Sequence, residues 1–182
     1  MLLNPKIQKA INIATREHRH QKRKSNGIPY IVHPFSVAWL LAEQTKDEDI
    51  ICAGLLHDVL EDTADYGVDD MLRDFDEKVT QIVKDVTEDK SLSWRERKEK
   101  YIKNFETSSQ ESLLVAVADK IHNLTAIRDQ ILETGENPFG VEFKSFDESK
   151  WFYESVYDVM ERRLENKIFL NEFKEIMEKV FE

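Results

Sequence analysis

Apolar residues recur in this chain at intervals of three and four positions, and few residues interrupt that pattern. Such a repeat places apolar side chains along one face of an α-helix, whereas a half-buried strand needs strict alternation. The 182 residues include only five glycines and four prolines, the residues that most often end a helix. The sequence therefore predicts an all-α fold, a helical bundle of about eight to nine helices joined by short loops.

Prolines, glycines and capping residues mark where the predicted helices begin and end. The segment from Asp47 to about Leu60 is so rich in Ile, Ala and Leu that we expect a central buried helix. A second core helix is expected from about Ser109 to Gly135, and Ser93-Trp94-Arg95-Glu96 matches the capping box at a helix start. The remaining helices are expected after Pro5 and Pro34, at about 68–75 and 79–86, and at 150–166 and 171–181.

The balance of charges limits what the chain can bind. Its formal net charge is −10, which argues against binding of DNA, RNA or an anionic membrane, because such affinity comes from lysine and arginine. A small anionic ligand would need a local basic patch or a bound cation within this repulsive field.

No shift in composition divides the chain, so we expect one domain over residues 1–182.

The cysteine content and the N-terminus indicate where the protein resides. Cys52 is the only cysteine and lies in an apolar run, so no internal disulfide forms and a reducing compartment is expected. Residues 1–10 contain no long apolar core, which excludes a signal peptide or a membrane span there. We therefore expect a cytoplasmic protein, and the sequence leaves open whether it is a homo-oligomer.

Four polar side chains gather at the end of the most apolar predicted helix: His57, Asp58, Glu61 and Asp62. Residues four apart share one side of a helix, so His57 and Glu61, and Asp58 and Asp62, would form one compact cluster. A cation would relieve the repulsion among the three carboxylates. The structural alternative is that His57 and Asp58 only cap the helix end.

Two further candidate ligands come from other segments. His33 precedes Pro34, so we expect it in extended backbone just before a helix, with its side chain free to enter a cleft. Asp119 is a carboxylate amid the apolar residues of the second core helix, and buried carboxylates are paired or bind metal. With His57 and Asp58 these residues offer two imidazoles and two carboxylates, a set suited to Mn²⁺, Fe²⁺ or Zn²⁺.

Such a metal site could perform hydrolysis. A bound divalent ion would make water a nucleophile and neutralise a phosphoryl oxygen, while Glu61 and Asp62 would orient or deprotonate that water. Lys22, Arg23 and Lys24 form the one tight basic cluster of the chain, close before His33. That cluster could contact a nucleobase or balance phosphate charge, and its alternative is a solvated charge run.

These motifs, in this order, resemble the HD-domain phosphohydrolases, and within them the alarmone hydrolases related to the hydrolase domain of Rel/Spo proteins, especially the stand-alone small alarmone hydrolases. The resemblance covers about residues 6 to 165. The matching segments are His18 with residues 22–34, residues 55–63, residues 86–90 and 95–98, and residues 118–124.

The resemblance implies a fold, a metal and a substrate. It implies an HD-domain bundle that holds Mn²⁺, or alternatively Zn²⁺, and removes the 3′-diphosphate of guanosine tetra- or pentaphosphate to give GDP or GTP and pyrophosphate. The implied roles are metal ligation by His33, His57, Asp58 and Asp119, water activation by Glu61 and Asp62, and substrate contacts from Arg23, Lys24, Ser25 and Asn123.

Two alternatives stay open at this stage. The same metal site could remove a 2′- or 3′-phosphate from a different nucleotide, as a phosphatase or nucleotidase. A non-catalytic nucleotide-sensing module is the other alternative, because a fold does not fix a function. The sequence departs from many relatives in two places. They carry an arginine at or near the position of Thr125, and the acidic loop over residues 131–149 has no role that the sequence predicts.

Overall fold

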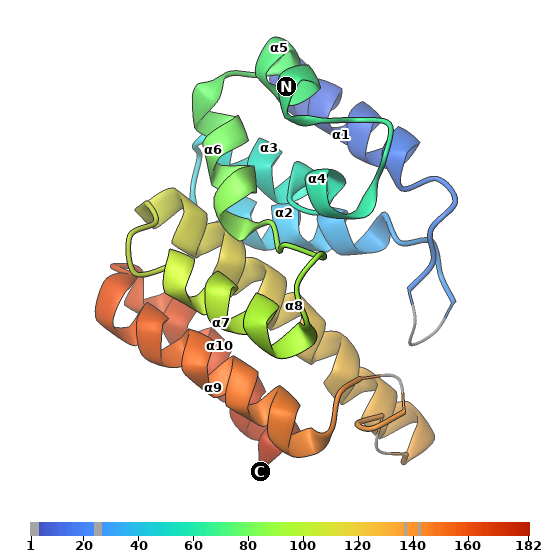
Figure 1. The fold of residues 1–182 in the computed structure, drawn as a ribbon, viewed down its shortest axis with the longest axis vertical. Helices are drawn as coiled ribbons and strands as arrows, with labels where there is room; N and C mark the ends of the chain where they lie inside the picture. Colours follow the sequence, from blue (N-terminus) through green and yellow to red (C-terminus); the bar gives the residue numbers. More distant parts are fainter. Residues whose placement is uncertain (1–3, 24–26, 137, 142) are drawn as a thin grey trace.

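The computed structural model describes residues 4–23, 27–136, 138–141 and 143–182. Over these residues the chain forms ten helices and no strand beyond two isolated bridges, so the predicted all-α fold is confirmed (Figure 1). One helix, α4, is a single four-residue turn. The helices are α1 (Pro5–Glu17), α2 (Val32–Gln44), α3 (Glu48–Leu56), α4 (Val59–Asp62), α5 (Val68–Asp74), α6 (Glu77–Val86), α7 (Trp94–Asn104), α8 (Gln110–Thr134), α9 (Phe146–Arg163) and α10 (Lys167–Phe181).

Helix α8 is the central element of the bundle. It packs against α2, α3 and α6 on one side and against α9 and α10 on the other, and Figure 1 shows it crossing the molecule between these groups. The Ser109 hydroxyl caps its first turn, and Gly135 ends it with a left-handed φ of 68°. Because both ends are fixed, each buried residue of α8 has a defined position along the helix axis. Asp119 is one of these buried residues.

Helices α2 and α3 form an antiparallel pair joined by a short connection, so the start of α2 lies beside the end of α3. Gly54 of α3 allows their close approach. A Cβ atom at this position would clash with Leu41 Cδ1 and lie 3.5 Å from Ala38 Cα. The pairing brings His33, near the start of α2, and His57, at the end of α3, to the same place in the fold.

The central apolar helix is shorter than predicted. We expected one helix from Asp47 to about Leu60, but α3 ends at Leu56, and α4 follows after a two-residue turn at His57 and Asp58. Asp58 has φ −94° and ψ −7° and stands at the N-cap of α4, yet its side chain makes no cap hydrogen bond. The interruption turns the Asp58 carboxylate toward other partners, described below.

The predicted backbone of His33 is wrong. His33 lies in the first turn of α2 and not in extended backbone before it, because the chain enters the helix through hydrogen bonds to the Pro29 and Tyr30 carbonyls. Pro34 is tolerated there since the first backbone N–H groups of a helix have no partner within it. The side chain still points inward, and only 1% of its surface is exposed.

The last two helices begin about four residues earlier than predicted. Helix α9 starts after the cap Ser145, whose hydroxyl accepts from the Glu148 amide at 3.3 Å, and α10 starts after the cap Asn166. The loop after α8 is therefore shorter than expected. Phe146 of α9 packs against Phe139 and Phe181, which ties the loop to the end of α10.

In the described parts of the chain, no helix combines the length and the apolar character that crossing a membrane requires.

Candidate active site

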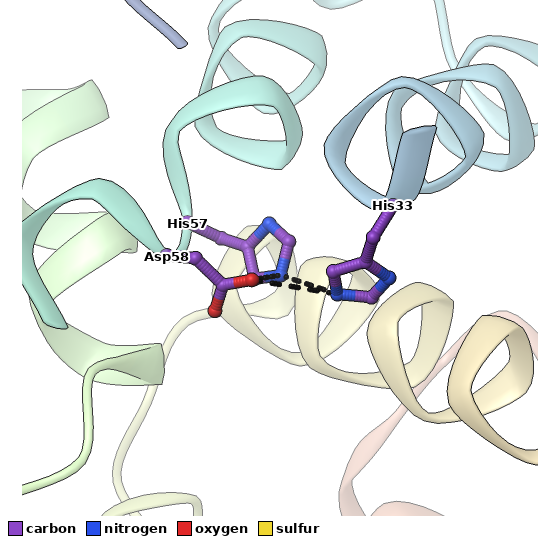
Figure 2. Close-up of side chains that lie close together, drawn as sticks. All are labelled: His33, His57 and Asp58. Atoms are coloured by element: carbon purple, nitrogen blue, oxygen red, sulfur yellow. Dashed lines mark hydrogen bonds and ion pairs between the residues drawn. The ribbon is translucent and has the colours of Figure 1, made fainter. Parts of the chain in front are cut away.

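Two histidines from α2 and α3 face each other at the centre of the site. His33 Nε2 and His57 Nε2 lie 3.1 Å apart, and both rings are almost fully buried (Figure 2). The antiparallel pairing of α2 and α3 produces this approach from residues 24 positions apart in the sequence.

Two carboxylates complete the group. Asp58 Oδ2 lies 3.1 Å from His57 Nε2 and 3.5 Å from His33 Nε2. Figure 2 shows the Asp58 carboxylate directed toward both rings. From α8, Asp119 Oδ1 lies 3.1 Å from His33 Nε2 and 3.8 Å from His57 Nε2. Donor atoms that share one divalent ion at about 2.0–2.2 Å are separated by roughly 3–3.5 Å, so the spacing among His33, His57 and Asp58 fits a single ion. The structure thus brings together all four predicted ligands, and His33, His57 and Asp58 can hold a metal ion.

Neighbouring groups fix the direction of each imidazole. His57 Nδ1 donates to the Gly54 carbonyl at 2.8 Å, which leaves the lone pair on Nε2, the nitrogen that faces the other donors. His33 Nδ1 lies 2.7 Å from Nδ1 of His122, one turn after Asp119 on α8. His122 therefore contacts a predicted ligand at the ring nitrogen that does not face the other donors.

Hydrogen bonds also fix both carboxylates. The Tyr30 hydroxyl donates to Asp58 Oδ2 at 2.6 Å. Lys120 Nζ donates to Asp119 Oδ2 at 2.6 Å, and Asn123 Nδ2 donates to Asp119 Oδ1 at 2.5 Å. Such partners hold metal-binding side chains in a single orientation.

The electrostatics of the four donors favour a cation between them. Burial opposes a charge on His57, but the Asp58 and Asp119 carboxylates outweigh it and raise the pKa of His57 to about 9. Burial would raise the pKa of Asp58, yet the His57 imidazolium beside it holds that pKa well below its usual range. Burial lowers the pKa of His33. The two carboxylates therefore stabilise positive charge at this position, and a divalent ion would replace the proton on His57.

Glu61 lies one turn beyond Asp58 and lines the same cavity, whose volume is about 230 Å³. Burial raises the pKa of Glu61 to about 7, although its Oε2 accepts a hydrogen bond of 2.9 Å from the Glu88 backbone N–H. A carboxyl group with such a pKa can accept a proton near neutral pH and can also release it.

Asp62 also lines this cavity, but basic and polar neighbours restrain it. Its carboxylate forms an ion pair with Lys90, and its backbone carbonyl accepts from Gln21 Nε2 at 2.8 Å. Lys90 Nζ lies 3.8 Å from Glu61 Oε1 as well, so a single lysine contacts both predicted water-activating residues.

A second cavity of about 490 Å³ adjoins the first and shares residues with it, among them Tyr30, Glu61 and Asn123. Basic side chains line it, including Lys22 and Arg23. Arg23 donates to Asn123 Oδ1 at 3.0 Å, so Asn123 links the basic cluster to the metal-binding carboxylate. Two predicted substrate contacts, Lys24 and Ser25, fall outside the described residues.

Three residues that hold the site together were not predicted from the sequence: Tyr30, Lys120 and Lys90. Lys120 carried a signal, because a lysine inside the apolar run of α8 is as unusual as Asp119 beside it. Tyr30 precedes His33 by three residues, but whether its hydroxyl reaches Asp58 depends on how two separate segments pack.

Comparison with known proteins supports the predicted resemblance. Residues 10–138 match the family model for the HD domain. The chain is 40% identical over 126 residues to a GTP pyrophosphokinase of Streptomyces coelicolor, and this match covers 67% of the chain but 15% of that relative. It is also 40% identical over 121 residues to human MESH1, a guanosine-3′,5′-bis(diphosphate) 3′-pyrophosphohydrolase, covering 65% of the chain and 67% of MESH1.

Solved structures agree with these matches over a longer part of the chain. A metazoan orthologue of SpoT that hydrolyses ppGpp superposes with a TM-score of 0.82 and 30% sequence identity, over 98% of this chain and 97% of that one. The Listeria monocytogenes protein lmo0812 superposes with a TM-score of 0.72 and 32% identity, over 85% of this chain and 97% of that one. The chain therefore belongs to the HD-domain family, as its His-Asp motif and the order of its other motifs predicted.

Proposed function

We propose that this chain is a metal-dependent hydrolase that removes the 3′-diphosphate of guanosine tetra- or pentaphosphate, giving GDP or GTP and pyrophosphate. The main support for this proposal is that donor atoms of four residues converge beside the Glu61 carboxyl group: His33, His57, Asp58 and Asp119. MESH1 and the SpoT orthologue are named for this reaction, and the chain shares their family, which supports the choice of substrate.

The proposed ligands are His33, His57, Asp58 and Asp119, and the proposed ion is Mn²⁺, with Zn²⁺ or Fe²⁺ as alternatives. Two imidazole nitrogens and two carboxylate oxygens suit a borderline or hard divalent ion. When bound, such an ion supplies Lewis acidity, which makes water nucleophilic near neutral pH and balances charge on a phosphoryl oxygen.

Glu61 is the proposed general base and Asp62 its partner in orienting the attacking water. The ionised Glu61 takes a proton from the water whose oxygen attacks the phosphorus next to the ribose. That proton can pass to the ribose 3′ oxygen when its bond to phosphorus breaks. Lys90, which contacts both carboxylates, holds Asp62 beside Glu61.

The adjoining cavity is the proposed place of the nucleoside. Arg23 and Asn123 line it and are the proposed contacts, since a guanidinium can stack on a base or pair with phosphate and an amide can bond to ribose or phosphate. Lys24 and Ser25 stay predicted contacts on the strength of the resemblance alone.

Pyrophosphate release from guanosine tetraphosphate tests the proposal. Purified protein would be stripped of metal with a chelator and assayed without metal and with Mn²⁺, Zn²⁺ or Fe²⁺ added, beside an Asp58→Asn variant. We expect release of pyrophosphate that depends on added metal and is lost in the variant. Release of inorganic phosphate from another nucleotide instead would favour a phosphatase or nucleotidase, and nucleotide binding without turnover would favour a sensing module.

The absence of DNA or RNA binding stays a prediction, the sequence leaves open whether the chain is a homo-oligomer, and a cytoplasmic location stays a prediction. Electrophoretic mobility shift, light scattering and cell fractionation would test them in turn.

A further inference from the structure

Glu88 connects helix α7 to the proposed general base. Its backbone N–H donates to Glu61 Oε2 at 2.9 Å. Its own carboxylate, only 8% exposed, meets two cations of α7: Lys98 Nζ donates to Oε1 at 2.5 Å, and Arg97 Nε lies 2.8 Å from Oε2 as an ion pair without the alignment of a hydrogen bond.

Contacts on both sides of Glu88 hold the loop ends: the Thr87 hydroxyl donates to the Val83 carbonyl at 2.8 Å, and the Asp89 carboxylate pairs with Lys100 at 2.9 Å. Glu88 belongs to the connection between α6, which ends at Val86, and α7, which begins at Trp94. The amide of a loop residue can take many directions unless a side chain fixes the loop. The pairing of the Glu88 carboxylate with Arg97 and Lys98 fixes this part of the loop to α7, which packs against α9.

The anchoring residues are themselves held in place. The Lys98 side chain is 14% exposed, and its Nζ lies 4.2 Å from the centre of the Phe152 ring on α9. A buried ion pair is weak evidence for stability, because taking both charges out of water offsets most of their attraction. A gain in folding stability therefore does not explain why the Glu88 carboxylate is buried between Arg97 and Lys98 beside the proposed active site.

We infer that Glu88 is a positioning residue: Arg97 and Lys98 fix its carboxylate, and its backbone N–H thereby sets the direction of the Glu61 carboxyl group. The inference rests on the proposed function, in which Glu61 is the base. A base that is misdirected by about 1 Å can lose roughly 100-fold in rate. Glu88 acts without touching the substrate, so its loss lowers kcat and leaves KM and metal affinity nearly unchanged.

The test compares four variants of the full chain. Arg97→Met removes one anchor and keeps an apolar side chain of similar length, and Glu88→Gln removes the charge that the anchors hold. Arg97→Lys restores the cation and serves as the conservative rescue. Lys100→Met is the matched control, because Lys100 lies on the same helix and pairs at 2.9 Å with Asp89, the next residue of the same loop.

Steady-state kinetics with guanosine tetraphosphate and Mn²⁺ give the first readout. We expect kcat to fall roughly 10- to 100-fold in Arg97→Met and Glu88→Gln, with KM changed less than about threefold, and to recover most of its value in Arg97→Lys. Lys100→Met should keep the kcat of the unmodified chain. Because Arg97 also lines the adjoining cavity, a rise in KM with unchanged kcat would mean that it contacts the substrate, and this would overturn the inference.

The second readout needs no turnover. In the metal-free protein, the ¹H chemical shift of the Glu88 amide would be followed by NMR from about pH 5 to about pH 9, where ionisation of Glu61 should move the amide signal downfield. The charged groups of Asp58, Asp62, Glu88 and Lys90 also act on Glu61, and all four residues are unchanged in Arg97→Met. The amplitude of the shift should fall by about half or more in Arg97→Met and be kept in Lys100→Met.

The two readouts separate the inference from the proposed function. An unmodified chain that does not cleave the substrate contradicts the proposed function, while its amide titration still reports whether Glu88 is anchored. An Arg97→Met protein that is folded by circular dichroism and keeps both kcat and the amide titration shows that the anchor does not position Glu61. If Arg97→Met does not fold, the same two measurements on Glu88→Gln decide.

Discussion

His33 Nδ1 and His122 Nδ1 lie 2.7 Å apart, so one of the two nitrogens must carry a proton and the other must accept it. Burial lowers the pKa of His122 to about 4, which leaves it neutral at pH 7 and able to accept. For His33 Nε2 to bind a metal ion, the proton of His33 must lie on Nδ1, where the neutral His122 can accept its hydrogen bond. A residue of α8 thus sets the tautomer of a ligand on α2.

Replacing His122 should therefore weaken metal binding without removing a ligand. We expect His122→Phe to raise the dissociation constant for Mn²⁺ roughly 10- to 100-fold, as loss of a hydrogen-bond partner of a metal-binding histidine usually does. Isothermal titration calorimetry would measure it, with His20→Phe as the control, because His20 is exposed and lies at the end of α1. Equal Mn²⁺ affinities for the two variants would show that His122 does not orient His33.

Loss of a proposed ligand should abolish stabilisation by metal. A ligand that binds only the folded state raises the free energy of unfolding, by about 2.7 kcal/mol at 100 times its dissociation constant. We expect Mn²⁺ to raise the Tm of the unmodified chain and of Asp158→Asn, an exposed aspartate on α9, but not that of Asp58→Asn. Elemental analysis of each protein would report the bound metal, and an Asp58→Asn protein that retains metal and turnover would refute the site.

The pKa of Glu61 predicts the acidic limb of the pH–rate profile. A base must be deprotonated to act, and burial raises the pKa of Glu61 to about 7, so kcat/KM should rise between about pH 6 and pH 8. The measurement is kcat/KM at saturating Mn²⁺ in buffers of constant ionic strength. A profile that is flat above about pH 5 would mean that Glu61 titrates as an exposed carboxyl group does and is not the base.

The same pKa shift predicts a cost in stability at alkaline pH. A carboxyl group whose folded-state pKa is raised stabilises the fold below its unfolded-state pKa, and that contribution is lost as pH rises through the folded-state value of about 7. Glu61→Gln cannot ionise. We expect it to be more stable than the unmodified chain at about pH 8, by on the order of 1–2 kcal/mol, and nearly equal in stability at about pH 4, below the unfolded-state pKa. Urea unfolding at both pH values measures this, and a variant that is less stable at both would contradict it.

The contact between α2 and α3 at Gly54 predicts a packing defect. A methyl group at Gly54 would clash with the buried Leu41 side chain, so Gly54→Ala should lower the free energy of unfolding by roughly 1–2 kcal/mol, despite the better helix propensity of alanine. In a double-mutant cycle, Leu41→Ala should be less destabilising in the Gly54→Ala background, because the new methyl group occupies part of the cavity. Additive effects would show that the two side chains do not meet.

Much of the helical content and of the candidate site followed from the sequence. Apolar periodicity predicted the second core helix, α8, and the capping box predicted the start of α7, because both signals are properties of consecutive residues. The starts of α9 and α10 were placed about four residues late, since Ser145 and Asn166 cap turns whose first residues carry little apolar signal. The break after Leu56 was also missed, because nothing in the local pattern ends the apolar run there.

The sequence by itself determined which residue types could bind a metal, since two histidines and two aspartates in apolar surroundings leave few other roles. Only the tertiary structure decided how those donors are arranged. The distance of 3.1 Å between the histidine nitrogens depends on the close approach of α2 and α3 at Gly54. The contacts of His122 with His33 and of Glu88 with Glu61 join residues 89 and 27 positions apart. Such contacts form when separate helices pack, and no local pattern encodes them.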